Sequence, residues 1–186
     1  PETAWLIRWQ DVVTLTGKAL GLSQEAATLV SETEAFLKQE AAAYPELQGK
    51  VFANVVNRND GQVAIRMQGD PRVQLFADIG MVPAPEAPGG AVLPSGISYT
   101  LSYENFDQIP ADMLVSFFND AASANDFFGM DLIKLSPLVA KGAYTRFEGE
   151  ELTMAVSGAV TPLSLRWGFP EVIKGVGEAA ANAAKP

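Results

Sequence analysis

Short apolar runs alternate with helix-like segments in the part of the chain that follows Gly49, and this alternation constrains the fold more than any other feature. Runs with the length and composition of buried strands occupy residues 50–56, 63–68, 113–118 and 143–148. Strands that alternate with helices form βαβ units, which pair in parallel and carry helices on both faces of the sheet. The sequence therefore predicts an α/β fold: a three-layer lobe with a mainly parallel central sheet flanked by helices.

Turn and helix signals separate these runs. The Asn-Asp-Gly stretch within residues 57–62 predicts a turn between the first two strands. Asp70 occupies an N-cap position, Pro71 follows as the first helical residue, and Gly80 lies just past the end, so a short helix is predicted there. A final Ala-rich helix is predicted from about Pro170.

The first third of the chain has the periodicity of helix. Apolar residues recur at helical spacing up to Gly21, and a second amphipathic run begins at Ser23 and ends at Pro45. If continuous, the two runs would span roughly 60 Å at about 1.5 Å per residue. We therefore expect a long N-terminal helix in residues 1–48, followed by an α/β lobe in residues 49–186.

Two tryptophans mark this N-terminal region. Trp5 and Trp9 lie one helical turn apart and would form a single apolar patch. An apolar patch on a helix at a chain end needs a partner surface. Self-association through Trp5 and Trp9 is one way to cover it.

Composition removes several classes of function. The chain has no Cys and no His, so thiol nucleophiles, Ser-His-Asp triads and zinc sites built on thiolate or imidazole are excluded. A net charge of -9 argues against nucleic acid as a partner. No Gly-rich phosphate loop is present, and the acids Glu148, Glu150 and Glu151 indicate a solvated turn rather than an acid/base pair. Nothing in the sequence requires an enzyme.

Candidate binding residues follow the predicted strands. In open α/β sheets, ligands bind beyond the carboxyl ends of the strands, and Asn57, Arg58 and Asn119 occupy such positions. The planar guanidinium of Arg58 is suited to an anionic ligand, although an ordinary hairpin turn explains the same residues. Glu104 is either a solvated carboxylate in the first turn of a short helix or a surface acid offered to a basic partner.

Four segments resemble one protein family, in the correct order along the chain. They are WLIRWQDVVTLTGKALG (5–21), YPELQGKVFANV (44–55), LSYENFDQIPADMLVSF (101–117) and SGAVTPLSLRWGFPEVI (157–173). These segments are similar to motifs of the ABC-transporter substrate-binding proteins for ferric siderophores. This class has two α/β lobes joined by a single long helix and also includes cobalamin- and haem-binding members.

The resemblance implies a receptor rather than an enzyme. Residues 1–48 would be the interlobe helix region and residues 49–186 the C-terminal lobe, with the N-terminal lobe, its signal peptide and its lipid-anchored cysteine absent. The receptor would be extracytoplasmic, in the periplasm or anchored to the cell surface as a lipoprotein. Iron would arrive within the siderophore, so the protein would need no metal ligands and no cofactor of its own.

Residue roles also follow from the resemblance. Glu104 matches the carboxylate that docks on the membrane permease, and Asp112 matches an acid before a buried strand with a structural role. Residues positioned to contact the chelate are Arg58, Asn57, Tyr99, Tyr103, Asn119 and Trp167.

Other classes of function stay open at this point. The chain could serve a cobalamin or haem receptor of the same class. It could also be a single-domain α/β enzyme with a carboxylate-bound metal, or an interaction module that dimerises through Trp5 and Trp9.

Overall fold

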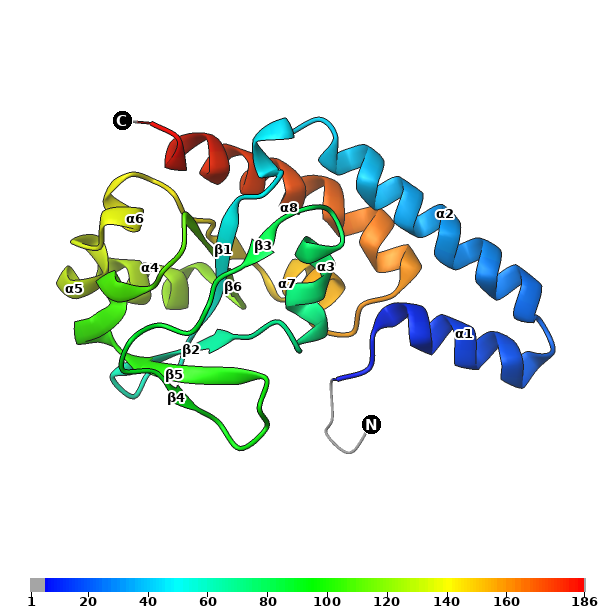
Figure 1. Ribbon diagram of the computed structural model, residues 1–186, viewed down its shortest axis with the longest axis horizontal. Coiled ribbons are helices and arrows are strands. Elements are labelled where there is room, and N and C mark those ends of the chain that lie inside the picture. Colours follow the sequence, from blue (N-terminus) through cyan, green and yellow to red (C-terminus); the bar gives the residue numbers. More distant parts are fainter. Residues whose placement is uncertain (1–5, 186) are drawn as a thin grey trace.

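The computed structural model describes residues 6–185, which form helical layers around a central mixed sheet (Figure 1). The strand order of this sheet is β4-β5-β2-β1-β6-β7, with β1 and β6 as interior strands and β3 pairing to the start of β1. The strands are β1 (Val51–Asn57), β2 (Gln62–Arg66), β3 (Val82–Pro83), β4 (Ala91–Val92), β5 (Ser98–Ser102), β6 (Met113–Phe118) and β7 (Phe147–Glu148).

The sheet has a parallel half and an antiparallel half. β1 pairs in parallel with β3 and β6, and β6 pairs in parallel with β7. β2, β5 and β4 are antiparallel, because the tight turn after Asn57 returns the chain directly alongside β1. The predicted α/β class, with helices on both faces of the sheet, is confirmed.

Helices cover both faces of the sheet (Figure 1). α4, α5, α6 and η2 lie over one face, while α3, α7 and α8 lie over the other, with α2 alongside α8 and α1 packed against α2. The helices are α1 (Trp9–Leu20), α2 (Ser23–Ala41), η1 (Pro45–Leu47), α3 (Pro71–Ala77), η2 (Tyr103–Gln108), α4 (Ala121–Gly129), α5 (Asp131–Lys134), α6 (Pro137–Ala140), α7 (Glu150–Ser157) and α8 (Pro162–Ala183).

Alternate residues of the central strands build two separate hydrophobic cores. Phe52 and Val115 pack with the helices α2, α3, α7 and α8, while Val55 and Leu114 pack on the opposite face around Phe127. This alternation follows from the two-residue side-chain period of a strand. Both faces of β1 and β6 are therefore buried, which explains why their sequences are almost continuously apolar.

The predicted long N-terminal helix is instead a hairpin of two helices. Gly21 ends α1 in the left-handed conformation, with φ of 74°, and the chain reverses into α2. The two helices pack closely: a Cβ on Gly17 would lie 2.3 Å from the Cβ of Ala26. α2 alone, with 19 residues, is the longer element of this region.

The predicted exposed tryptophan patch is not present as expected. Trp9 is only 7% exposed and belongs to the core that includes Leu37 and Phe169. Trp5 lies outside the described residues. Burial of Trp9 means that it does not form the expected exposed patch with Trp5, and self-association of the chain stays a prediction.

The C-terminal helix begins earlier than predicted. Thr161 and Ser164 form a reciprocal capping box, and Pro162 occupies the first turn, so α8 begins eight residues before Pro170. Pro170 lies inside the helix. Glu150 and Glu151, predicted to lie in a turn, form the first turn of α7, where the helix dipole favours acidic side chains.

Candidate functional site

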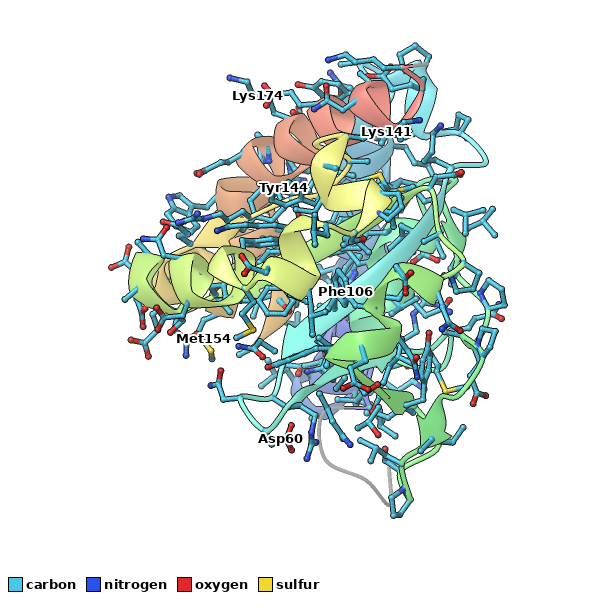
Figure 2. All side chains as sticks on the ribbon, turned by 90° about the vertical axis from the view of Figure 1, so that its left-hand side faces the viewer. Asp60, Phe106, Lys141, Tyr144, Met154 and Lys174 are labelled. Carbon is cyan, nitrogen blue, oxygen red and sulfur yellow. The ribbon has the colours of Figure 1, made fainter. Side chains whose placement is uncertain are left out.

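The carboxyl ends of the parallel strands lie at one end of the molecule. β1 ends at Asn57, β6 at Phe118 and β7 at Glu148, and the loops that follow share one edge of the sheet. Figure 2 shows Asp60, in the turn after β1, at the end opposite Lys141 and Lys174. This edge is where an open α/β sheet binds a ligand.

A hydrogen-bonded cluster forms at this edge after β1. The Tyr103 hydroxyl donates to Oδ1 of Asn57, and the same oxygen accepts from the backbone N–H of Asn59 at 3.2 Å. Burial, followed by the nearby charge of Asp60, raises the pKa of Tyr103. Its hydroxyl therefore stays protonated at neutral pH and remains a hydrogen-bond donor.

The charge of Arg58 is already balanced within its own turn. Its Nη2 lies 3.1 Å from Oδ2 of Asp60, and its Nε donates to the same oxygen at 3.2 Å. Because both side chains of the Arg58–Asp60 ion pair are exposed to solvent, the attraction between them is weak. Arg58 can therefore contact a ligand, but as part of a neutral pair rather than as a free cation.

Asn119 lies on the loop that follows the neighbouring strand. It is exposed and comes one residue after the end of β6. The adjacent Asp120 accepts the Ser123 N–H at 2.7 Å as the N-cap of α4, and this hydrogen bond lowers the pKa of Asp120. The structure thus places Asn57, Arg58, Tyr103 and Asn119 along one edge.

Tyr99 has a structural role, and its burial removes it from the residues expected to contact a ligand. It is 1% exposed, and its hydroxyl oxygen accepts the Ala87 N–H at 3.1 Å. Gly90 approaches the ring so closely that an added Cβ would lie 2.7 Å from it. The ring therefore fixes the Pro- and Gly-rich loop against β5. Burial raises the pKa of Tyr99, since the phenolate would be desolvated there.

Trp167 lies on a different surface. It is 59% exposed on the outer face of α8, one turn after Leu163, which is 81% exposed. No hydrogen bond or ring contact among residues 6–185 joins it to the Asn57 cluster. Trp167 belongs to an apolar stripe at the beginning of α8 rather than to the strand-end cluster.

Glu104 is exposed beside the same edge. It occupies the first turn of η2, directly after Tyr103. Within the described part of the chain, its carboxylate has no hydrogen-bond or ion-pair partner. The side chain is therefore available to a cationic group of another protein.

The sequence analysis missed a charged cluster in the interior. Asp70 is fully buried and accepts three hydrogen bonds from Arg72, from its backbone N–H at 2.9 Å, from its Nε at 2.7 Å and from its Nη2. The Nε of Arg66 lies 3.7 Å from the same carboxylate, and its Nη1 donates to Oδ1 of Asn54 at 2.6 Å. A charged residue inside the strand predicted over residues 63–68, as Arg66 is, was the available signal.

The charged form of Arg66 is destabilised in this position by the loss of hydrating water. Burial and then the like charge of Arg72 lower the pKa of Arg66 to about 10, against the opposing effect of Asp70. The side chains of Arg66 and Arg72 are 17% and 22% exposed. Two guanidinium groups thus share one carboxylate in a largely dehydrated environment.

A cavity of about 270 Å³ opens beside Arg72. The residues that line this cavity are almost all apolar, and Arg72 is the charged residue among them. The lining includes Ile7, Trp9, Val12, Leu75, Val156 and Val160. An apolar cavity with one convergent charged group is the usual form of a small-molecule site.

Comparison with solved structures identifies the fold. The iron-uptake ABC-transporter substrate-binding protein PiaA from Streptococcus pneumoniae TIGR4 matches with a TM-score of 0.74 and 26% identity, over 96% of this chain and 61% of PiaA. PiaA in complex with ferrichrome matches with a TM-score of 0.75 and 25% identity, over 96% and 60%. The chain has the fold of an ABC-transporter substrate-binding protein. The siderophore-binding protein FhuD from Vibrio cholerae, bound to Fe3+-Desferal, matches with a TM-score of 0.70 and 11% identity, over 91% and 61%.

These matches confirm the predicted resemblance to ABC-transporter substrate-binding proteins of the siderophore class. The chain spans about 60% of the length of PiaA and FhuD. No protein-family model and no curated protein sequence matches the chain. Within residues 6–185 of this substrate-binding fold, no helix is long and apolar enough to cross a membrane, and no group of acids is placed to hold a metal ion.

The two arginines of the cluster contribute differently to stability. Arg72→Met would leave the buried Asp70 without its closest cation, so we expect the free energy of unfolding to fall by about 2–3 kcal/mol. Arg66→Met would remove a desolvated like charge at the cost of one hydrogen bond to Asn54, so we expect a change within about 1 kcal/mol. Urea unfolding followed by circular dichroism measures both, and equal losses would contradict this assignment.

Proposed function

We propose that the chain is the helical hairpin and C-terminal lobe of the solute-binding component of an ABC importer for iron(III)-siderophore complexes. The observation that carries the proposal is the match over 96% of this chain to PiaA, which has been solved in complex with ferrichrome. The proposed receptor works outside the cytoplasm and binds its ligand without chemical change. Residues 1–48 form the interlobe region, and residues 49–186 form the lobe.

The proposed ligand face is the edge at the carboxyl ends of β1 and β6. Asn57, Arg58, Tyr103 and Asn119 supply polar contacts there, and the cavity beside Arg72 supplies apolar surface with one cation. All iron ligands come from the siderophore, so the protein recognises the outer surface of the chelate. Trp167 contacts the chelate only if the complete cleft extends along α8.

A second lobe covers the remaining side of the ligand in this proposal. The helical hairpin exposes a series of large apolar side chains, which a monomeric domain rarely leaves to solvent. They are Val12 (41%), Leu15 (56%), Leu20 (68%), Leu22 (46%) and Leu29 (39%). A lobe that precedes residue 1 in the chain would cover this surface and complete the cleft.

The sequence encoded immediately upstream of Pro1 tests the two-lobed receptor. We expect a lipoprotein signal followed by an α/β segment of about 100 residues or more, the size of a domain. A start codon directly before Pro1 would contradict the proposal, because no second lobe would then exist.

Glu104 is the proposed docking group for the permease. Its carboxylate is exposed and unpaired beside the ligand edge, where a basic pocket of the permease would meet it. Glu104→Gln should reduce siderophore-dependent iron uptake by about tenfold while leaving chelate affinity unchanged.

The control for this experiment is Asp107→Gln, which removes a charge from an exposed residue of the same short helix. We expect normal uptake from this variant. Equal uptake by the Glu104 and Asp107 variants would exclude a specific docking role for Glu104.

A further inference from the structure

The turn between β1 and β2 contains the one Asp-Gly dipeptide of the chain, Asp60–Gly61. In an Asp-Gly pair, the peptide nitrogen of glycine can attack the carboxyl carbon of the aspartate side chain. Glycine permits this attack best, because it has no side chain beside the nitrogen and the widest choice of backbone conformation. The proposed function gives the dipeptide no role beyond the ion pair of Asp60 with Arg58.

The folded turn leaves both reacting groups accessible. The side chain of Asp60 is 47% exposed, and Figure 2 shows it at the periphery of the molecule. Within residues 6–185, the Gly61 N–H donates no hydrogen bond. Apart from the chain neighbours of Gly61, no atom lies within 4 Å of the position that a Cβ on this residue would occupy. No hydrogen bond therefore has to break before the nitrogen can approach the Asp60 side chain.

The backbone of the turn is constrained on both sides of Asp60. Asn59 has φ of 59° and Gly61 has φ of 82°, so both lie in the left-handed region. Among the described residues, Asn59 is the one residue other than glycine with positive φ, a conformation that L-residues adopt at an energetic cost. Isoaspartate adds one methylene group to the main chain and gives the turn more length. Relief of this constraint favours the rearranged product.

We propose that Asp60 converts spontaneously to isoaspartate in the folded protein, which makes this turn a covalent modification site. The Gly61 nitrogen bonds to Cγ of the protonated Asp60 side chain, and the Cγ hydroxyl leaves with the nitrogen's hydrogen as water. Water then adds to the main-chain carbonyl of the resulting succinimide, and the bond from that carbon to nitrogen breaks. The nitrogen keeps its bond to Cγ and regains a hydrogen, and the new carboxylate lies on Cα. Mass is unchanged, and no oxidant or reductant is consumed.

The modification changes contacts at the edge that carries Asn57 and Tyr103. Oδ2 of Asp60 lies 3.1 Å from Nη2 of Arg58 and accepts from its Nε at 3.2 Å. Isoaspartate holds its carboxylate directly on the main chain, so this contact through two nitrogens is lost. The Gly61 carbonyl accepts the Tyr103 N–H at 3.0 Å, and the change therefore reaches the first residue of η2. This chemistry belongs to the chain alone and is independent of the proposed siderophore ligand.

The test incubates the 186-residue chain, folded and unfolded in urea, in mildly acidic buffer at physiological temperature. Trypsin cleaves after Arg58 and Arg66, so Asp60 is followed in the peptide 59–66. We expect the peptide from the folded chain to split into two chromatographic peaks of equal mass. The new peak should accept a methyl group from S-adenosylmethionine in the presence of an isoaspartyl methyltransferase. A folded chain that forms no such peak, in the time in which the unfolded chain forms it, would overturn the inference.

Two controls separate the dipeptide from exposure alone. Asp60→Glu keeps the negative charge opposite Arg58 but requires a larger ring, so the new peak should be lost. Asp107 is exposed and followed by Gln108, and we expect no isoaspartate there in the same digest. Equal conversion at Asp107 would contradict a site specific to the turn.

NMR of the 15N-labelled chain measures the effect on the edge. We expect a second set of signals for the Arg58 Nε–H and the Tyr103 amide, growing with the isoaspartate peak. Unchanged signals for both groups in a converted sample would overturn the inferred change in contacts.

Discussion

The parallel pairing of β1 with β6 determines most of this structure. Phe52 faces Met113 and Val55 faces Ser116 in register, and Asp112 fixes the start by accepting the Val51 N–H at 2.9 Å. Because both strands are buried on both faces, helices must cover each side. Parallel pairing also brings the carboxyl ends of the two strands to one edge, and this places the loops that carry the candidate ligand residues together.

The sequence predicted correctly those strands and helices whose formation depends on interactions between residues close together in the chain. The apolar runs of β1 and β6 and the Asp70 cap of α3 are confirmed, because strand period and helix capping depend on neighbouring residues. The helical hairpin, α7 and β5 were not predicted. The hairpin depends on Gly17, whose lack of a side chain allows contact between two helices and carries no distinct signal in one sequence.

Some residues of the candidate site could likewise be predicted from the sequence, and others could be found only in the structure. Because ligands bind beyond the carboxyl ends of the strands in open α/β sheets, the sequence positions of Asn57, Arg58 and Asn119 alone made them candidates. The sequence could not show that Tyr99 is covered by the loop of Ala87, or that Arg66 meets Asn54 across the paired strands β1 and β2. Those contacts exist only after the sheet has formed. Buried charges of this kind are therefore visible in the structure and easily overlooked in the sequence.

The central claim is that this chain presents a chelate-binding face at the carboxyl ends of β1 and β6. High-spin iron(III) broadens the NMR signals of nearby nuclei, so the ligand itself reports its location. The most direct measurement is therefore a titration of the 15N-labelled chain with a ferric siderophore. The account predicts selective broadening of the amide signals around Asn57, Tyr103 and Arg72. Broadening centred on Lys141 and Lys174, at the opposite end of the molecule (Figure 2), would contradict it.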